Sequence, residues 1–255
     1  MSTAVIAPAL ARYALALGDD ALVFAERCGE WITRAPQLEE DVALANIGLD
    51  LLGQARTLLT YAGEVEGAGR DEDNLAFLRE QRDFTNVQLV EHPNGDFALS
   101  MGRLLVFSAY QLELYTRLAA GTDSTLAGIA AKAVKEVDYH LDHATSWVLR
   151  LGDGTPLSHE RMQAGLDRLW PLVPELFDGS WVDEELVAAG AAVDPSVLGE
   201  PVLLRVTAVV ERATLQVPDR PARSTGGRSG VHSQAMGDLL AQMQHLHRSH
   251  PGASW

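Results

Sequence analysis

The chain has 255 residues, of which 47% are hydrophobic and 22% are charged, and these fractions exclude disordered, collagen-like and low-complexity proteins. Its 35 acidic and 20 basic residues leave a net charge of −15, which opposes binding to nucleic acid and to anionic membranes. The longest stretch without a charged residue is residues 1–11, whereas a helix that spans a bilayer needs about 20 apolar residues, so no transmembrane segment is expected.

The first 150 residues have the periodicity of helices, with apolar residues recurring at intervals of three and four. The pattern predicts four long helices, over residues 8–31, 38–65, 96–120 and 124–152. Pro36 separates the first two, and a longer connection separates the second from the third. Four long helices with one longer connection in the middle are typical of a four-helix bundle, so we predict an all-α fold.

Shorter elements are expected in the rest of the chain. The central connection and the C-terminal third contain further helical patterns, over residues 75–79, 84–90, 158–177, 197–216 and 233–248. No internal repeat and no long linker divides the sequence. We therefore predict one domain over residues 1–255, with a bundle core at about 8–152 and a C-terminal helical extension at about 156–255.

Two of the long helices carry polar stripes where a bundle needs an apolar face. In the second helix, Asn46, Asp50 and Gln54 are four residues apart and share one face among leucines. The stripe of the fourth helix consists of Lys132, Glu136, His140 and His143. The first helix adds Glu26 and Glu30, and the third adds Glu113. Carboxylates and histidines on four helices are typical of ferritin-like di-metal proteins, so we predict a ferritin-like bundle.

The ligand spacing of such a di-metal site is broken. Two of its four helices normally carry Glu-x-x-His, which directs both ligands at the metal pair. No histidine precedes His92, so the second helix has no such pair. In the fourth helix Tyr139 follows Glu136 by three residues, and His140 is one position late, turned by about 100° around the helix. We interpret the site as lost, with vestigial ligand positions at Glu30, Asp50, Glu113, Glu136 and His140.

Other interpretations of the fourth helix stay open at this point. Lys132 and Lys135 flank Glu136, which is also the pattern of a solvated face. His140 and His143 are either a metal-binding pair or an ordinary surface pair. If Glu136 is buried, Lys132 one turn away could replace the charge of the metal with a buried ammonium group. This last hypothesis requires that both groups are shielded from bulk water.

The cysteine content and the N-terminus indicate a compartment. Cys28 is the only cysteine, so no disulfide can form within the chain, and a lone thiol fits a reducing environment. The N-terminus has no basic segment followed by an apolar one, so no signal peptide is expected. We therefore expect a cytoplasmic protein.

Residues 38–56, which read LEEDVALANIGLDLLGQAR, resemble a signature of the family of phenylacetyl-CoA epoxidase C subunits. Three further segments agree with that family: Arg82–Asn86 leading to Pro93–Gly95, Lys135–Leu141, and Thr225–His232. The resemblance extends from about Gly18 to Trp255, almost the whole chain. Because four separated motifs occur in the same order as in that family, chance is a poor explanation of the similarity.

The resemblance implies a role in phenylacetate catabolism. Members of that family are ferritin-like proteins without a working di-iron centre, and they form hetero-oligomers with a homologous A subunit that holds the iron and performs the chemistry. The complex uses O2 and NADPH, through a separate reductase with flavin and an iron–sulfur centre, to epoxidise the ring of phenylacetyl-CoA. By resemblance, this chain is a structural subunit with no cofactor of its own. An acidic residue at Glu113 is not explained by the family pattern.

The substrate of that family carries phosphate groups, which an acidic chain can bind only through local donors. The first candidate is the segment from Arg79 to Asn86, near an expected helix start where free backbone N–H groups favour anions. The resemblance places acyl-CoA near this segment, and the candidate contacts are Arg82, Asp83, Phe84, Thr85 and Asn86. The second, weaker candidate is the glycine-rich loop over residues 217–232, with Arg220, Arg223 and Arg228, for which a contact between subunits is the alternative.

Three other functions compete with the structural subunit. A self-sufficient di-metal oxidase would use Glu136 and His140, together with Glu26 or Glu30, Asp50 and Glu113, as ligands. A second alternative is a bundle that binds a partner and never contacts substrate. A nucleophilic enzyme would use Cys28, but a cysteine on an apolar helix face is usually a small core residue. We favour the non-catalytic partner subunit of a di-iron ring epoxidase, with the di-metal oxidase as the alternative.

Overall fold

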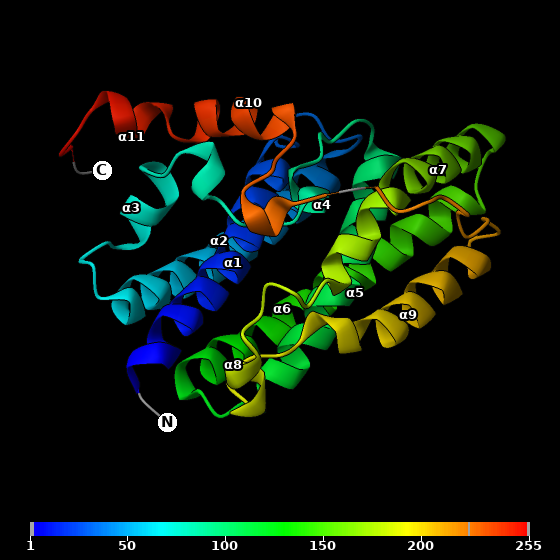
Figure 1. Ribbon diagram of the computed structural model, residues 1–255. Coiled ribbons are helices and arrows are strands. Elements are labelled where there is room, and N and C mark those ends of the chain that lie inside the picture. The colour runs from blue at the N-terminus through cyan, green and yellow to red at the C-terminus, as the bar shows by residue number, and fades with distance from the viewer. Residues whose placement is uncertain (1–2, 224, 254–255) are drawn as a thin grey trace. The chain divides into compact units, whose positions relative to one another are not determined.

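A computed structural model describes residues 3–223 and 225–253, and no β-strand occurs among them. The four long helices predicted from the periodicity are present as α1 (Thr3–Gly29), α2 (Leu38–Glu66), α5 (Phe97–Leu118) and α6 (Ser124–Gly152) (Figure 1). The predictions for these four helices are confirmed, and α1 begins earlier than the sequence pattern indicates. None of the helices in the described part of the chain is long and apolar enough to cross a bilayer.

Local sequence signals define the ends of these helices. Asp96 and Asp123 cap α5 and α6, because each carboxylate accepts a hydrogen bond from the backbone N–H three residues later. The first turn of α2 carries three acidic residues, which the positive end of the helix dipole favours. At its other end Gly67 adopts a left-handed conformation, with φ of 68°, that few other residues tolerate.

The chain forms two compact units. Unit 1 consists of residues 1–93, 182–192 and 225–255, and its core is the antiparallel pair of α1 and α2 (Figure 1). The two helices approach closely at glycines: a Cβ on Gly18 would lie 2.8 Å from the Leu59 side chain, and one on Gly48 would lie 3.3 Å from Cys28. Cys28 is buried in this core, as expected for a small apolar residue.

The rest of unit 1 consists of short elements. They are α3 (Glu72–Phe77), a 3-10 turn (Gln81–Asp83), α4 (Gln88–Glu91), α8 (Glu184–Ala188), a second 3-10 turn (Gly227–Ser229), α10 (Gln234–Met243) and α11 (His245–Ser249). The helix predicted over residues 84–90 is wrong in its first half, because the backbone from Phe84 to Val87 is extended and only α4 is helical. The extended backbone is stabilised by hydrogen bonds to α1, which the helical pattern does not reveal.

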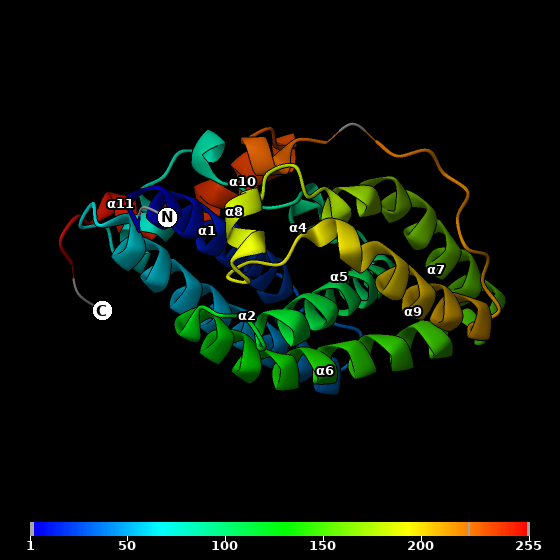
Figure 2. The same cartoon turned by 60° about the horizontal axis from the view of Figure 1, so that its bottom comes forward.

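Unit 2 consists of residues 94–181 and 193–224. Its α5 and α6 lie side by side, and α7 (Pro156–Leu169) and α9 (Gly199–Arg212) pack on both (Figure 2). The helix predicted over residues 158–177 is two elements, because Pro171 and Pro174 lack the N–H that an α-helix needs and the segment Trp170–Phe177 is a 3-10 helix. A second 3-10 turn, Pro195–Leu198, precedes α9.

The division into two units differs from the predicted division into a bundle core at about 8–152 and a C-terminal extension at about 156–255. Residues 225–255 belong to unit 1 with the N-terminal helices, whereas residues 193–224 belong to unit 2 with α5 and α6. The C-terminal third of the chain is therefore shared between both halves of the protein. The single domain over residues 1–255 stays a prediction.

Gly63 of α2 is expected to be intolerant of a side chain. A Cβ there would lie 2.1 Å from the Arg70 carbonyl oxygen, so Gly63→Ala should lower the free energy of unfolding by about 1–3 kcal/mol through overpacking. Gly53 of the same helix is the matched control, because nothing lies within 4 Å of its Cβ position. Gly53→Ala should raise stability by up to about 1 kcal/mol through helix propensity. Urea unfolding compares the two variants, and equal effects would contradict the close approach at Gly63.

Candidate functional site

Two adjacent carboxylates in the middle of α1 are the centre of a buried polar cluster in unit 1. Asp19 and Asp20 have almost no exposed surface, and each is paired with an arginine distant in the sequence. Arg79 binds both oxygens of Asp19, with Nη1 at 3.0 Å from Oδ2. Arg228 binds both oxygens of Asp20, with Nη1 at 3.0 Å and Nη2 at 2.7 Å. Bidentate pairs of this kind give the guanidinium group a defined orientation.

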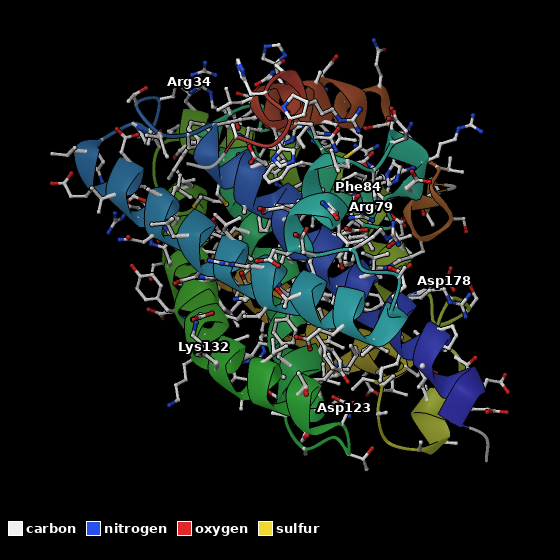
Figure 3. The ribbon with its side chains drawn as sticks, turned by 90° about the vertical axis from the view of Figure 1, so that its left-hand side faces the viewer. Arg34, Arg79, Phe84, Asp123, Lys132 and Asp178 are labelled. Atoms are coloured by element: carbon white, nitrogen blue, oxygen red, sulfur yellow. The ribbon has the colours of Figure 1, made fainter. Side chains whose placement is uncertain are left out.

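The extended segment from Phe84 to Val87 supplies further donors to the same carboxylates. The Thr85 N–H and hydroxyl group donate to Asp19 Oδ2 at 2.8 Å and 3.0 Å, and the Val87 N–H donates to Asp20 Oδ1 at 2.9 Å. The Arg79 guanidinium also lies over the Phe84 ring, 4.0 Å from its centroid (Figure 3). These contacts explain why this segment is extended rather than helical.

A third acid–base pair, Glu91 and His232, lies beside the first two. His232 Nδ1 is 2.7 Å from Glu91 Oε2, and its Nε2 is 2.9 Å from the Phe84 carbonyl oxygen. Both ring nitrogens face an oxygen acceptor, and this arrangement favours a ring that is protonated on both nitrogens, an imidazolium cation. Glu91 also accepts from the Ser233 N–H at 2.6 Å and from the Asn86 side-chain amide at 3.0 Å.

Together these groups form the acid–base cluster, defined as Asp19, Asp20, Arg79, Glu91, Arg228 and His232. When His232 is protonated, three carboxylates face three cations, and the charges of the cluster balance. Burial raises the pKa of Asp20, and the ion pair with Arg228 and the Val87 N–H offset part of that rise. Each charge is therefore tolerated in the interior only because its partner is present.

The cluster joins two of the segments that carry the family resemblance, residues 82–86 and 225–232. Arg228 donates to the Thr85 carbonyl oxygen at 2.8 Å, and His232 contacts the carbonyl oxygen of Phe84. Gly230 lies against the same segment with φ of 74°, and a Cβ there would be 2.2 Å from the Arg82 carbonyl oxygen. These motif residues therefore connect the C-terminal segment to the central connection.

The structure changes the interpretation of the candidate acyl-CoA contacts. Phe84 and Asn86 are buried, and Thr85 is bound to Asp19, whereas Arg82 and Asp83 are exposed. The expected helix start is only a three-residue 3-10 turn. The backbone N–H groups that we expected to bind a phosphate donate to the chain's own aspartates instead. The anions bound by these N–H groups are therefore internal, and a contact of Arg82, Asp83, Phe84, Thr85 or Asn86 with acyl-CoA stays a prediction.

The three arginines of the weaker anion-binding loop are divided between the two units. Arg228 is committed to Asp20, to the Thr85 carbonyl oxygen and to the Ala16 carbonyl oxygen at 3.1 Å, all within unit 1. Arg220 and Arg223 belong to unit 2, where Arg220 forms an exposed ion pair with Asp167 at 3.0 Å. The three arginines therefore do not form one phosphate-binding loop in unit 1 or in unit 2.

Three of the positions predicted to be vestigial metal ligands have a cationic side chain as partner. Glu30 pairs with Arg27 in α1. Glu113 pairs with Arg205 of α9 at 3.2 Å and lies 3.8 Å from Arg117, which explains an acid at this position. Glu136 pairs with Lys132 at 3.3 Å. A carboxylate held by arginine or lysine has its charge compensated without a metal.

The buried ammonium predicted for Lys132 is wrong in the chain by itself. Its side chain is 74% exposed and points away from α6, while Glu136 is only 18% exposed (Figure 3). The long lysine side chain reaches the carboxylate from the solvent side, because its stem is flexible enough to keep the charge in water. His140 of the same stripe is buried, whereas its neighbour Tyr139 is exposed.

Neither unit contains a metal site among the described residues. In the chain between residues 3 and 253, residue 224 excepted, no three His, Cys, Asp or Glu side chains are close enough to hold a metal ion. In α2, Asn46 is exposed, Asp50 is half-buried and Gln54 is buried, so the stripe crosses from one face to another. Glu26 of α1, another of the candidate ligands, has a raised pKa, because burial and the neighbouring Glu30 both disfavour its charged form.

A cavity of about 310 Å³ lies in unit 1 between α1, α2 and α3. Its walls are mainly apolar, and its charged lining residues are Arg12, Glu66 and Arg70. Arg70 binds Glu66 through Nε at 2.9 Å, and this pairing raises the pKa of Arg70. The volume is at the lower end of the range for ligand pockets, about 300–1,000 Å³. The lining contains no cysteine, serine or histidine that could serve as a nucleophile or base.

Comparison with known proteins places the chain in a family. The family model described as phenylacetic acid catabolic protein matches residues 2–255. The chain belongs to this family. It is also similar to a protein of Escherichia coli strain K12 that is named as the C subunit of 1,2-phenylacetyl-CoA epoxidase, with 48% identity over 246 residues, which cover 96% of this chain and 99% of that protein.

Members of the phenylacetic acid catabolic protein family are ferritin-like helical proteins, so the all-α, ferritin-like fold predicted from the sequence is confirmed. The resemblance drawn from four short motifs is confirmed as well. Sequence reasoning missed the acid–base cluster. The adjacent carboxylates of Asp19 and Asp20 inside an otherwise apolar stretch were a visible signal of it.

Removal of one partner from the cluster should be severely destabilising. Arg228→Met leaves the Asp20 carboxylate buried without its cation, so the free energy of unfolding should fall by about 3–5 kcal/mol. Arg220→Met is the matched control, because the Arg220 side chain is 54% exposed and its pair with Asp167 contributes at most about 1 kcal/mol. Denaturant unfolding measures both. A loss of similar size in both variants would show that the buried pair has no special role.

The stability of the protein should also depend on the charge of His232. Burial by itself lowers the pKa of this ring, but the hydrogen bond and ion pair with Glu91 and the Phe84 carbonyl oxygen outweigh it, so the pKa is raised. A raised pKa means that the contribution to stability is complete below about pH 6.5 and is lost as the pH rises through the pKa of the folded protein.

Unfolding at a series of pH values should show this loss in the wild type and not in His232→Gln, whose side chain does not titrate. A wild-type pH profile identical to that of the variant would contradict a charged His232.

Proposed function

We propose that this chain is the non-catalytic, structural subunit of a phenylacetyl-CoA ring epoxidase in phenylacetate catabolism. The observation that carries the proposal is the 48% identity to the E. coli protein, which extends over 96% of the chain. An identity of this size over nearly the full length of both proteins leaves no room for a different domain arrangement. It therefore supports the same place in an assembly of several different subunits.

The partner in this proposal is the homologous ferritin-like A subunit, which would hold the two irons and perform the ring epoxidation. Electrons would come from NADPH through the separate reductase. The present chain would form a hetero-oligomer with the A subunit and support its bundle. A catalytic bundle must hold its metal ligands in fixed positions, and packing against a second bundle limits the movement of those helices.

The ion pairs at the vestigial positions support a chain without its own di-iron centre. Two irons would need carboxylate oxygens that are free to bind them. Here the carboxylates of Glu30, Glu113 and Glu136 are paired with arginine or lysine side chains. The sequence also lacks both Glu-x-x-His pairs. The residues present therefore do not fit a ferritin-like di-iron site, and we assign no catalytic step to them.

Iron content tests the proposal directly. The chain expressed alone in iron-rich medium should contain almost no iron, whereas the complex purified after co-expression with the A subunit should contain about two irons per A subunit. Oxygen- and NADPH-dependent consumption of phenylacetyl-CoA should require the A subunit and the reductase, and this chain alone should not support it. The measurements are metal analysis of each preparation and product analysis of each reconstituted mixture.

Two irons bound per chain in the preparation without the A subunit would contradict the structural role. That outcome would instead identify the di-metal oxidase that uses Glu136 and His140. Absence of any complex with the A subunit would contradict the proposed partner.

A further inference from the structure

One face of α2 is apolar and exposed. Leu38 is 73% exposed, Val42 54%, Leu49 64% and Leu52 46%. Elsewhere in the described chain, large exposed apolar residues on long helices occur singly, as Leu204 does in α9. Four such side chains on one helix form a patch of the kind that marks an interaction surface.

The spacing of these residues is that of a coiled-coil seam. Together with the half-exposed Ala45 they follow one another at intervals of four, three, four and three residues. This alternation repeats every seven residues and keeps a stripe facing one partner helix along its length. We call these five residues the α2 seam, defined as Leu38, Val42, Ala45, Leu49 and Leu52.

Another face of α2 is buried. Leu44, Ile47 and Leu51 on this face have almost no exposed surface. The helix is therefore apolar on two faces, and it is less amphipathic than α6 or α9. A helix with this pattern is typical of one that is covered on both sides.

The charges beside the seam indicate the character of the helix that covers it. Glu39 is exposed next to Leu38, and Asp41 lies at the other side of the seam near the same end. At the next position of the repeat, Arg56 pairs with Glu72 at 3.2 Å, which ends the apolar stripe. A partner helix with lysine or arginine opposite Glu39 and Asp41 would complement the acidic end.

We propose that the α2 seam docks an amphipathic helix of another subunit, with aliphatic residues at heptad spacing and basic residues beside Glu39. This inference rests on the proposed function, because it takes the A subunit as the chain that carries the helix. A second copy of this chain is disfavoured, since each copy has a net charge of −15 and like charges repel. The seam forms the apolar centre of a larger contact, because a stable interface needs about 800 Å² on each partner.

The test uses the full chain with purified A subunit as the probe. In Leu49→Glu/Leu52→Glu, two carboxylates replace apolar side chains in the middle of the seam. The dissociation constant should rise at least about tenfold, because a charge buried in a helix–helix contact lacks a partner. Both positions are exposed in the isolated chain, so its thermal unfolding should change little. Leu204→Glu, at a single exposed leucine with 71% exposure, is the matched control and should bind like the wild type.

Each outcome has a definite meaning. Wild-type binding by the seam variant would overturn the seam as the docking site while leaving the proposed function intact. A wild-type chain that forms a dimer in sedimentation experiments, with a monomeric seam variant, would overturn the proposal in favour of a second copy. A wild-type chain that does not bind the A subunit at all would contradict the proposed function and, with it, the proposal that the α2 seam is a docking site.

Discussion

The burial of Asp19 and Asp20 side by side in α1 is the constraint on which the rest of unit 1 depends. Two adjacent carboxylates cannot stay ionised in a protein interior without cations and N–H donors at close range. Arg79, the segment around Thr85, and Arg228 meet this need, and they come from parts of the chain 60 to 208 residues away. The central connection and the C-terminal segment are therefore held on α1 by charge pairing as well as by apolar packing.

This arrangement gives a physical meaning to motifs that first appeared as marks of a family. Segments 82–86 and 225–232 contain glycine, arginine and histidine, which often bind phosphate or metal. In the folded chain these residues bind one another, and Gly230 provides the close backbone approach that such binding needs. Polar residues characteristic of a protein family thus need not contact its substrate, since they also define how the chain closes on itself.

The predicted vestigial ligand positions concern a related balance of charges. A di-iron site supplies positive charge to a group of carboxylates, and in a chain without such a metal those carboxylates need other cations. In this chain Glu30, Glu113 and Glu136 are retained and face arginine or lysine. The supporting role proposed for the protein then relies on surfaces rather than on chemistry. The α2 seam is the clearest apolar surface of this kind.

The sequence by itself determined the long helices, because the interval between apolar residues depends only on the local geometry of a helix. It also determined the absence of Glu-x-x-His pairs and the family, because both depend on residue identities alone. Tertiary structure alone decided the partners of the charged side chains. Arg82–Asn86 resembled an open anion site because its donors are local, but the aspartates that fill it are in α1. Lys132 resembled a buried cation, yet it is solvated, because exposure depends on which helices cover a face. Contacts between residues distant in the sequence leave no periodic pattern, so they become visible only when the chain is folded.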